Sequence, residues 1–367
     1  MKILVLSYND INKDGRLNEI NRVMQKLGEV YIINVSSSKR FIPHPNIYTF
    51  KNKGILSYFL FVLYCVRQAQ KLGPFDMVVA DNRKGIIPAF LSKILSHIKY
   101  SLYDAREFYI YKEMGTFSSK LGCLIEKLFV PRFQIITCAN KYRSEGMQEL
   151  YGLKYTPIVF ENIRKLEYSD NSEKECADKF SYLFHDKNFI NIVTTSGEAL
   201  IRRADVLVEA LAKLGHKYRL FLIGYEDEEG HKKIEDICQK NNWHNIVRYK
   251  WLSKSQLKYI LSHCDIGIVN YSFQNTNNKY CASGKLYEFI FENLPVVTTS
   301  NPPLRLCEEK QIGVVDDNFY EGIMKVSKNY LFYKTNVAKL CRHIDIESNT
   351  NNVAKDIANY IKIMEKK

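Results

Sequence analysis

Short apolar segments alternate with helix-like segments twice along this chain of 367 residues, and this alternation limits the possible fold more than any other feature. The first series begins with an apolar run over 2–7 and a segment over 17–27 whose apolar positions have helical spacing. A second series begins with a run over 189–194 and a helical pattern over 204–214. Strands separated by helices of about ten residues or more form βαβ units. The sequence therefore predicts an α/β protein with two doubly wound parallel sheets.

The length also favours two domains, because a single domain typically has roughly 100–200 residues. We expect an N-terminal domain over 1–165 and a C-terminal domain over 188–350, joined by a linker over the charge-rich range 166–187. A last helix over 351–367 could cross back to the first domain. Two doubly wound sheets would place a ligand cleft between the carboxyl ends of their strands.

Composition and hydropathy are those of a soluble globular protein, with 46% hydrophobic and 25% charged residues. No apolar stretch reaches the roughly 18–20 residues of a spanning helix, and the apolar start over 1–6 is too short for a signal peptide. The nine cysteines are odd in number and lack Cys-x-x-Cys spacing, which favours reduced core residues. We expect a cytoplasmic protein, with peripheral attachment to the inner face of the cell membrane as an option.

The positive charge is unevenly distributed. The net charge is +13; residues 1–150 carry 22 Lys and Arg against 12 Asp and Glu, and residues 151–367 carry 31 against 28. A basic domain suits an anionic partner, such as nucleic acid, a phospholipid surface or a pyrophosphate-bearing substrate, although charge can also serve solubility alone. The aromatic segment 55–67, which has basic residues on both sides, could be an interfacial helix on anionic lipid or a buried helix of the first domain.

The segment that begins at Ser283-Gly284-Lys285 is the most informative for chemistry. A Ser-Gly pair that opens a helix offers backbone N–H groups and the positive helix end to an anion, and Lys285 adds a charge. Glu288 lies one turn further on, where its carboxylate could accept hydrogen bonds from ribose hydroxyls. A nucleoside diphosphate would satisfy these groups together. The alternative is a capped helix with a solvent-exposed Lys–Glu pair.

This segment resembles the Lys-x-x-Glu-Tyr…Gly-x-Pro-Val-Val signature of family-4-like GT-B glycosyltransferases of the bacterial polysaccharide type, with Asn293 at the usual glycine. Tyr103–Glu107 is similar to the family's Tyr-Asp-x-His-Glu, with Arg106 at the histidine position. Departures are Tyr280 in place of the first acid of the Glu-x7-Glu pattern, and Glu198 in place of an arginine. Further similar segments occur in the family's order at 14–19, 158–162, 196–203, 221–224 and 264–268.

The resemblance implies two Rossmann-like domains that face each other across a cleft. It also implies that a sugar is moved from a nucleotide-sugar co-substrate to a glycan or lipid-linked acceptor, with retention of configuration. Arginine, lysine and helix amides would stabilise the departing diphosphate. The candidates for donor binding are Gly15, Arg16, Gly197, Arg202, Arg203, Ser283, Gly284, Lys285, Leu286 and Glu288, and those for catalysis are Asp104, Arg106 and Glu107.

No metal site or resident cofactor is predicted, because Asp316-Asp317 lacks the Asp-x-Asp spacing that other glycosyltransferases use to hold a divalent ion. Asp104 and Glu107 could alternatively cap the turn that follows their strand. The same architecture could serve a nucleotide-sugar epimerase. A nucleic-acid-binding protein is supported by charge alone, without the motifs of RNA-binding modules, so no nucleic-acid partner is expected.

Overall fold

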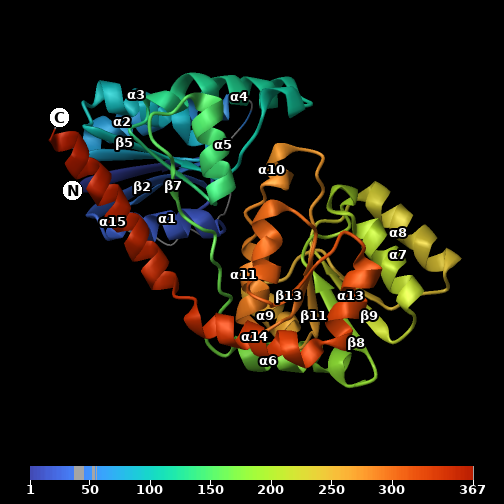
Figure 1. The fold of residues 1–367 in the computed structure, drawn as a ribbon. Helices are drawn as coiled ribbons and strands as arrows, with labels where there is room; N and C mark the ends of the chain where they lie inside the picture. The colour runs from blue at the N-terminus through green and yellow to red at the C-terminus, as the bar shows by residue number, and fades with distance from the viewer. Residues whose placement is uncertain (37–44, 52–53, 55, 367) are drawn as a thin grey trace. The chain divides into compact units, whose positions relative to one another are not determined.

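The computed structural model describes residues 1–36, 45–51, 54 and 56–366, and the chain divides into two compact units (Figure 1). Unit 1 comprises Met1–Asn162 and Ile346–Lys367, and unit 2 comprises Ile163–Asp345. Each unit is built on a parallel sheet, as the alternation of apolar and helical segments predicts. No helix within the described ranges is both long enough and apolar enough to cross a membrane.

The sheet of unit 1 has the strand order β3-β2-β1-β4-β5-β6-β7. All its pairs are parallel, and the order reverses between β1 and β4, where ligands commonly bind in open α/β sheets. Asp81 at the end of β4 stands opposite both Ser7 and Asp104, so three polar side chains meet at one sheet edge. The strands are β1 (Lys2–Ser7), β2 (Glu29–Ser36), β3 (Ile47–Lys51), β4 (Met77–Asp81), β5 (Tyr100–Ala105), β6 (Ile135–Cys138) and β7 (Ile158–Val159).

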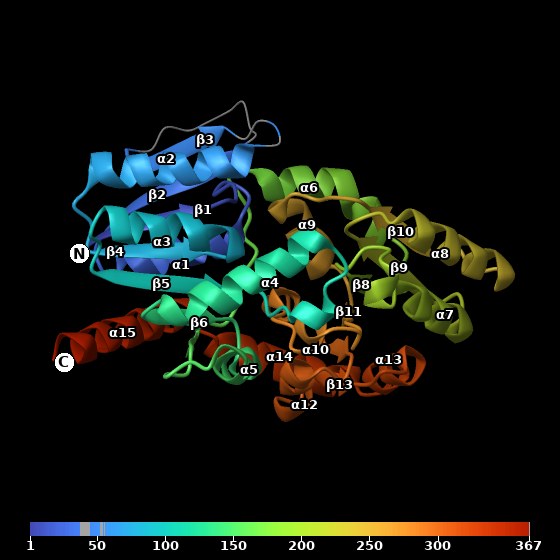
Figure 2. The same cartoon turned by 90° about the horizontal axis from the view of Figure 1, so that it is seen from above.

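Helices cover both faces of this sheet. On one face lie α2 (Ser57–Leu72), α3 (Ile86–Leu95) and α4 (Phe117–Phe129), with α3 between the other two (Figure 2). On the other face, α1 (Gly15–Gln25) and α15 (Ile346–Glu365) share a core with strands β1, β2, β4 and β5. The last helix therefore begins before the expected residue 351, and its Val353, Ile357 and Ile361 are buried in unit 1. Helix α5 (Lys141–Tyr151) connects β6 and β7.

The sheet of unit 2 has the order β10-β9-β8-β11-β12-β13. Helices α7 (Ala204–Leu214), α8 (Glu228–Lys240) and α13 (Phe319–Lys328) share one of its two cores. Helices α9 (Lys254–Ser262), α11 (Gly284–Phe291), α12 (Leu306–Glu309) and α14 (Tyr330–His343) share the other, and α10 (Thr276–Lys279) is a single turn. The strands are β8 (Ile190–Thr194), β9 (Tyr218–Ile223), β10 (Ile246–Tyr249), β11 (Ile266–Val269), β12 (Val296–Thr298) and β13 (Gly313–Val315).

The range 166–187 is not a linker. It contains α6 (Ser172–Phe180) and a short 3-10 turn over Ser181–Phe184, and both belong to unit 2. Cys176, Phe180 and Phe184 recur every four residues and are buried in the core with α9. The charged residues that suggested a linker occupy the other side of this amphipathic helix. The chain instead passes between the units at 162–163 and at 345–346.

Candidate functional site

The carboxyl edge of the unit 2 sheet brings together cationic side chains from distant parts of the sequence. Ser196 and Arg202 follow β8, and Lys285 lies in the first turn of α11. The Nζ of Lys285 donates to the Oγ of Ser196 over 3.1 Å. The guanidinium of Arg202 lies 4.0 Å from the centre of the Tyr271 ring and contributes to the electrostatic field at Lys285. The structure thus places two of the predicted donor-binding cations in one site.

Polar atoms of this site are buried without a hydrogen-bond partner among the described residues. They include the Nη1 of Arg202, the Oγ of Ser283 and the Oγ1 of Thr195. Ser283 precedes α11, but its side chain does not cap the helix, so the alternative of an ordinary helix cap does not describe it. Because buried polar groups are nearly always paired in proteins, these atoms fit a ligand that carries several oxygens.

Like charges and burial set the protonation of Lys285. Burial, with a contribution from Arg202, lowers the pKa of Lys285 to about 8, and Glu288 opposes this shift. Burial raises the pKa of Glu288, against the effect of Arg164 and Lys285. An anion bound between Lys285 and Arg202 would remove their mutual repulsion, so the site is electrostatically prepared for a negatively charged group.

A pocket of about 500 Å³ opens at the carboxyl ends of β8, β9 and β10, and Gly197, the residue after Ser196, is part of its lining. The lining also includes Tyr225, His231 and Tyr249. Glu198, which stands where the resemblance expects an arginine, is buried and accepts a hydrogen bond from the Nε of Arg248 over 3.0 Å. Its carboxylate also contacts the Nδ1 of His231 at 3.0 Å. Glu198 therefore fixes two side chains of the pocket wall, a role that the sequence motif did not reveal.

Gly197 has a role in loop geometry. Its φ is +65°, and a Cβ at this position would lie 2.3 Å from the carbonyl oxygen of Tyr225. Its N–H donates to the carbonyl of Ile223 over 2.9 Å. Glycine is thus needed because the loop after β8 passes against the loop after β9 in a left-handed conformation.

Three other predicted donor contacts are directed elsewhere. Arg203 forms an ion pair with Asp317 at 3.1 Å, which separates its role from that of Arg202. The N–H of Gly284 donates to the carbonyl of Ala282 over 3.1 Å, and is therefore not directed at an anion. Leu286 is buried in the unit 2 core and supports α11 through packing.

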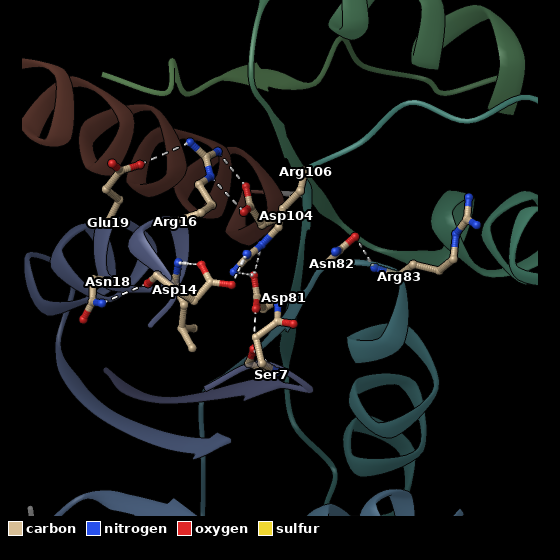
Figure 3. Close-up of polar contacts among 12 residues, drawn as sticks. Ser7, Asp14, Arg16, Asn18, Glu19, Asp81, Asn82, Arg83, Asp104 and Arg106 are labelled. Atoms are coloured by element: carbon tan, nitrogen blue, oxygen red, sulfur yellow. Dashed lines mark hydrogen bonds and ion pairs between the residues drawn. The ribbon is translucent and has the colours of Figure 1, made fainter. Parts of the chain in front are cut away.

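In unit 1, Arg16 and Asp104 form a buried ion pair (Figure 3). The Nε and Nη2 of Arg16 donate to the two carboxylate oxygens of Asp104 over 3.1 and 2.8 Å, and Nη1 donates to the carbonyl of Phe160 over 2.9 Å. Thr137 also donates to Asp104. Burial opposes ionisation of Asp104, but Arg16 holds its pKa below the ordinary value. This pairing favours structural roles for both residues, and the catalytic role of Asp104 and the donor contact of Arg16 stay predictions.

A second network in unit 1 reaches the sheet edge near the β1–β4 reversal. Arg106 donates through Nε to Asp81 over 2.7 Å and also pairs with Asp14, which caps α1 just before Gly15 (Figure 3). Burial raises the pKa of Asp81 to about 6, although Arg106 opposes this shift. Sequence reasoning missed Asp81, and its position at the end of a buried strand was the available signal.

Glu107 lies apart from these two networks. Its carboxylate is partly exposed and pairs with Arg143 at 3.5 Å. Among the three predicted catalytic residues, the side chains of Arg106 and Glu107 are thus partly exposed to solvent, whereas that of Asp104 is fully buried.

Both units are Rossmann-like: over the described residues, one is built on a seven-stranded parallel sheet and the other on a six-stranded one. The chain therefore has the GT-B fold. No protein-family model matches the sequence, and no curated protein matches it. Solved structures that resemble it include HepE from Anabaena in complex with UDP-glucose, with a TM-score of 0.73 and 13% identity over 98% of this chain and 100% of that chain.

Two further structures have the same likeness. WaaG, a glycosyltransferase involved in lipopolysaccharide biosynthesis, has a TM-score of 0.65 and 16% identity over 97% of this chain and 99% of its own. UDP-GlcNAc 2-epimerase from Neisseria meningitidis, bound to UDP-GlcNAc, has a TM-score of 0.63 and 13% identity over 98% of this chain and 99% of its own. At sequence identities this low, the structural similarity shows a shared fold and nothing about a shared function.

Proposed function

We propose that this protein is a glycosyltransferase that moves a sugar from a nucleotide-sugar donor to a glycan or lipid-linked acceptor in surface polysaccharide biosynthesis. The observation that carries the proposal is the pair of cations, Lys285 and Arg202, with unsatisfied polar atoms around them and a pocket at the same edge of the unit 2 sheet. The HepE structure with UDP-glucose supports the choice of a nucleotide sugar, because that protein has the same fold. Motif resemblance supports a metal-independent reaction with retention.

In the proposed reaction, the bond between the sugar's anomeric carbon and the diphosphate breaks, the oxygen of an acceptor hydroxyl forms the new bond to that carbon, and the proton of this hydroxyl passes to the leaving diphosphate. Negative charge then develops on the leaving diphosphate. Lys285 and Arg202 stabilise this charge from fixed positions, which lowers the barrier because no reorganisation is needed during the reaction. The pocket lined by Tyr225 and Tyr249 holds the nucleoside, and Glu288 accepts from the ribose hydroxyls.

The acceptor side belongs to unit 1 in this proposal. Arg106 and Glu107 lie after β5 and are the predicted catalytic residues that reach the surface. Their groups would position the acceptor, while Asp14 and Asp81 hold the Arg106 guanidinium in place.

The proposal is tested with a panel of UDP-, GDP- and dTDP-sugars. We expect at least one of them to raise the melting temperature, because a ligand that binds only the folded state stabilises it by about 2.7 kcal/mol at a hundred times its Kd. The same donor should be consumed when a suitable acceptor is added, with release of the nucleoside diphosphate. A folded protein that none of the donors stabilises would count against the proposed function.

A nucleotide-sugar epimerase is the second candidate, because the fold is shared with UDP-GlcNAc 2-epimerase. An epimerase would convert the donor without any acceptor and would release no sugar from the nucleotide. Chromatography of the nucleotide sugars after incubation without acceptor separates the two activities. We expect no epimerised product, and its appearance would favour the second candidate.

Donor binding should weaken as the pH rises through about 8, because the Lys285 ammonium loses its proton there. The pyrophosphate diester of a nucleotide sugar does not titrate between pH 7 and 9, so its charge stays constant over this range. We expect roughly a tenfold rise in Kd over this range. Titration calorimetry of Lys285→Arg is the control, since a guanidinium stays charged and should flatten the profile. Equal pH profiles for the two proteins would contradict the role of Lys285.

A further inference from the structure

Helix α4 of unit 1 has its apolar stripe on the solvent side. Its residues Phe117, Leu121, Leu124 and Leu128 recur at the spacing of one helix face, and their exposed fractions run from 46% to 83%. A surface helix of a globular protein normally shows the opposite arrangement, with the apolar face on the core. The polarity of α4 is therefore inverted.

The inward side of α4 is held by small and polar groups. Gly122 and Cys123 are buried, and a Cβ on Gly122 would lie 2.6 Å from the Arg83 side chain. Glu126 is buried as well, pairs with Arg83 and accepts from the Tyr103 hydroxyl over 2.8 Å. These contacts fix the orientation of the helix, so the apolar stripe cannot turn inward without breaking a buried ion pair.

The helices α2 and α3, which lie in the same layer as α4 (Figure 2), also carry exposed apolar residues. On and just before α2, Leu56, Phe59, Leu60 and Leu63 are exposed, while Phe61, Val62, Cys65 and Ala69 face the core. The segment 55–67, considered above either as interfacial or as buried, has one buried side and one exposed apolar side over its described residues 56–67. Ile55 lies outside the described residues. The last turn of α3 adds Ile94 and Leu95. Such an extended apolar surface is unusual on a soluble protein and marks an interaction site.

The charges on this layer are of one sign. All residues of α2, α3 and α4 are described, and Glu126, which is buried, is their only acid. Lys120 and Lys127 lie seven residues apart, along one border of the α4 stripe, and Arg67 and Lys71 follow the exposed part of α2. A second copy of this chain would present the same cations to them, whereas an anionic lipid headgroup would pair with them while the apolar side chains enter the acyl boundary.

We propose that the α2–α3–α4 layer of unit 1 docks on an anionic lipid bilayer. The stripe Phe117, Leu121, Leu124 and Leu128 enters the interface, and Lys120 and Lys127 bind phosphate headgroups. This inference stands on the surface of unit 1 and is independent of the donor site in unit 2.

Co-sedimentation with vesicles tests the proposal on the full chain. We expect binding to vesicles of phosphatidylglycerol with phosphatidylcholine, and at least about tenfold weaker binding to phosphatidylcholine alone. Phe117→Ser with Leu124→Ser should reduce binding to the anionic vesicles about tenfold or more, because two large apolar groups no longer leave water. Lys120→Gln with Lys127→Gln should remove most of the preference for the anionic lipid.

The matched control is Leu331→Ser with Phe332→Ser on α14 of unit 2. These two side chains are exposed by 77% and 52%, close to the 83% of Phe117 and 50% of Leu124. The control should bind like the original protein. The α4 serine variant and the α14 serine variant should both keep the original melting temperature, because the replaced side chains are exposed.

Three outcomes would overturn the proposal. They are failure of the original protein to sediment with anionic vesicles, equal loss of binding in the α4 and α14 variants, and a concentration-dependent dimer that the α4 substitutions abolish without any vesicle binding.

Discussion

Replacing Lys285 by alanine should weaken binding of a nucleotide sugar by about 10- to 150-fold, since a hydrogen bond to a charged group contributes about 1.5–3 kcal/mol. Lys285 is the residue of α11 whose ammonium meets the loop after β8, and Ser196 is its hydrogen-bond partner. Alanine would also leave Arg202 as the remaining cation at the proposed diphosphate position. Titration calorimetry with the donor that stabilises the protein measures the effect.

The matched control is Lys213→Ala on α7, a lysine of the same unit that pairs with Glu209 at the surface. It should bind the donor like the original protein. If Lys285→Ala also bound normally while keeping its melting temperature, the diphosphate position assigned to the start of α11 would be wrong.

Replacing Asp104 by alanine should destabilise unit 1 by about 3–5 kcal/mol, because removal of one partner leaves the other charge buried and uncompensated. The partner is Arg16, which is itself buried and gives three hydrogen bonds, two of them to this carboxylate. Urea unfolding followed by far-UV circular dichroism measures the change. Glu107→Ala, at a partly exposed carboxylate two residues after the end of β5, should leave the unfolding midpoint nearly unchanged.

A compensating pair sharpens this test. Arg16→Met combined with Asp104→Leu removes both charges, and apolar replacement of a buried pair is often neutral or stabilising. The double variant should therefore recover most of the stability that Asp104→Ala loses. An Asp104→Ala protein with unchanged unfolding but abolished turnover would instead restore the catalytic assignment of this residue.

The fold can be predicted from this sequence more completely than the site. Alternation of apolar and helical segments predicted both sheets, because the periodicity of burial is a local property of the chain. The range 166–187 was misjudged as a linker because its charged residues are conspicuous, whereas the stripe of Cys176, Phe180 and Phe184 is short. Sequence patterns show the composition of a segment more readily than the side that it buries.

In the site, the outcome depended on tertiary pairing. The motif around Arg16 and Asp104 predicted function for both residues, but their pairing across 88 positions of sequence can only be seen in the structure. The choice between Arg202 and Arg203 was equally undetermined by sequence, because adjacent residues point apart where the backbone turns left-handed at Arg203. Arg203 forms an ion pair with Asp317, whereas Arg202 lies near Lys285.

The two chain crossings make unit 2 an insertion within unit 1, since residues 163–345 separate α15 from the rest of its core. Synthesis from the N-terminus therefore produces unit 1 in two separate parts, and its core lacks Val353, Ile357 and Ile361 until all of unit 2 has been made. Unit 2, by contrast, is contiguous and can finish folding first. Loss of α15 would therefore damage the core of unit 1 and spare unit 2, although unit 2 directly precedes this helix in the chain.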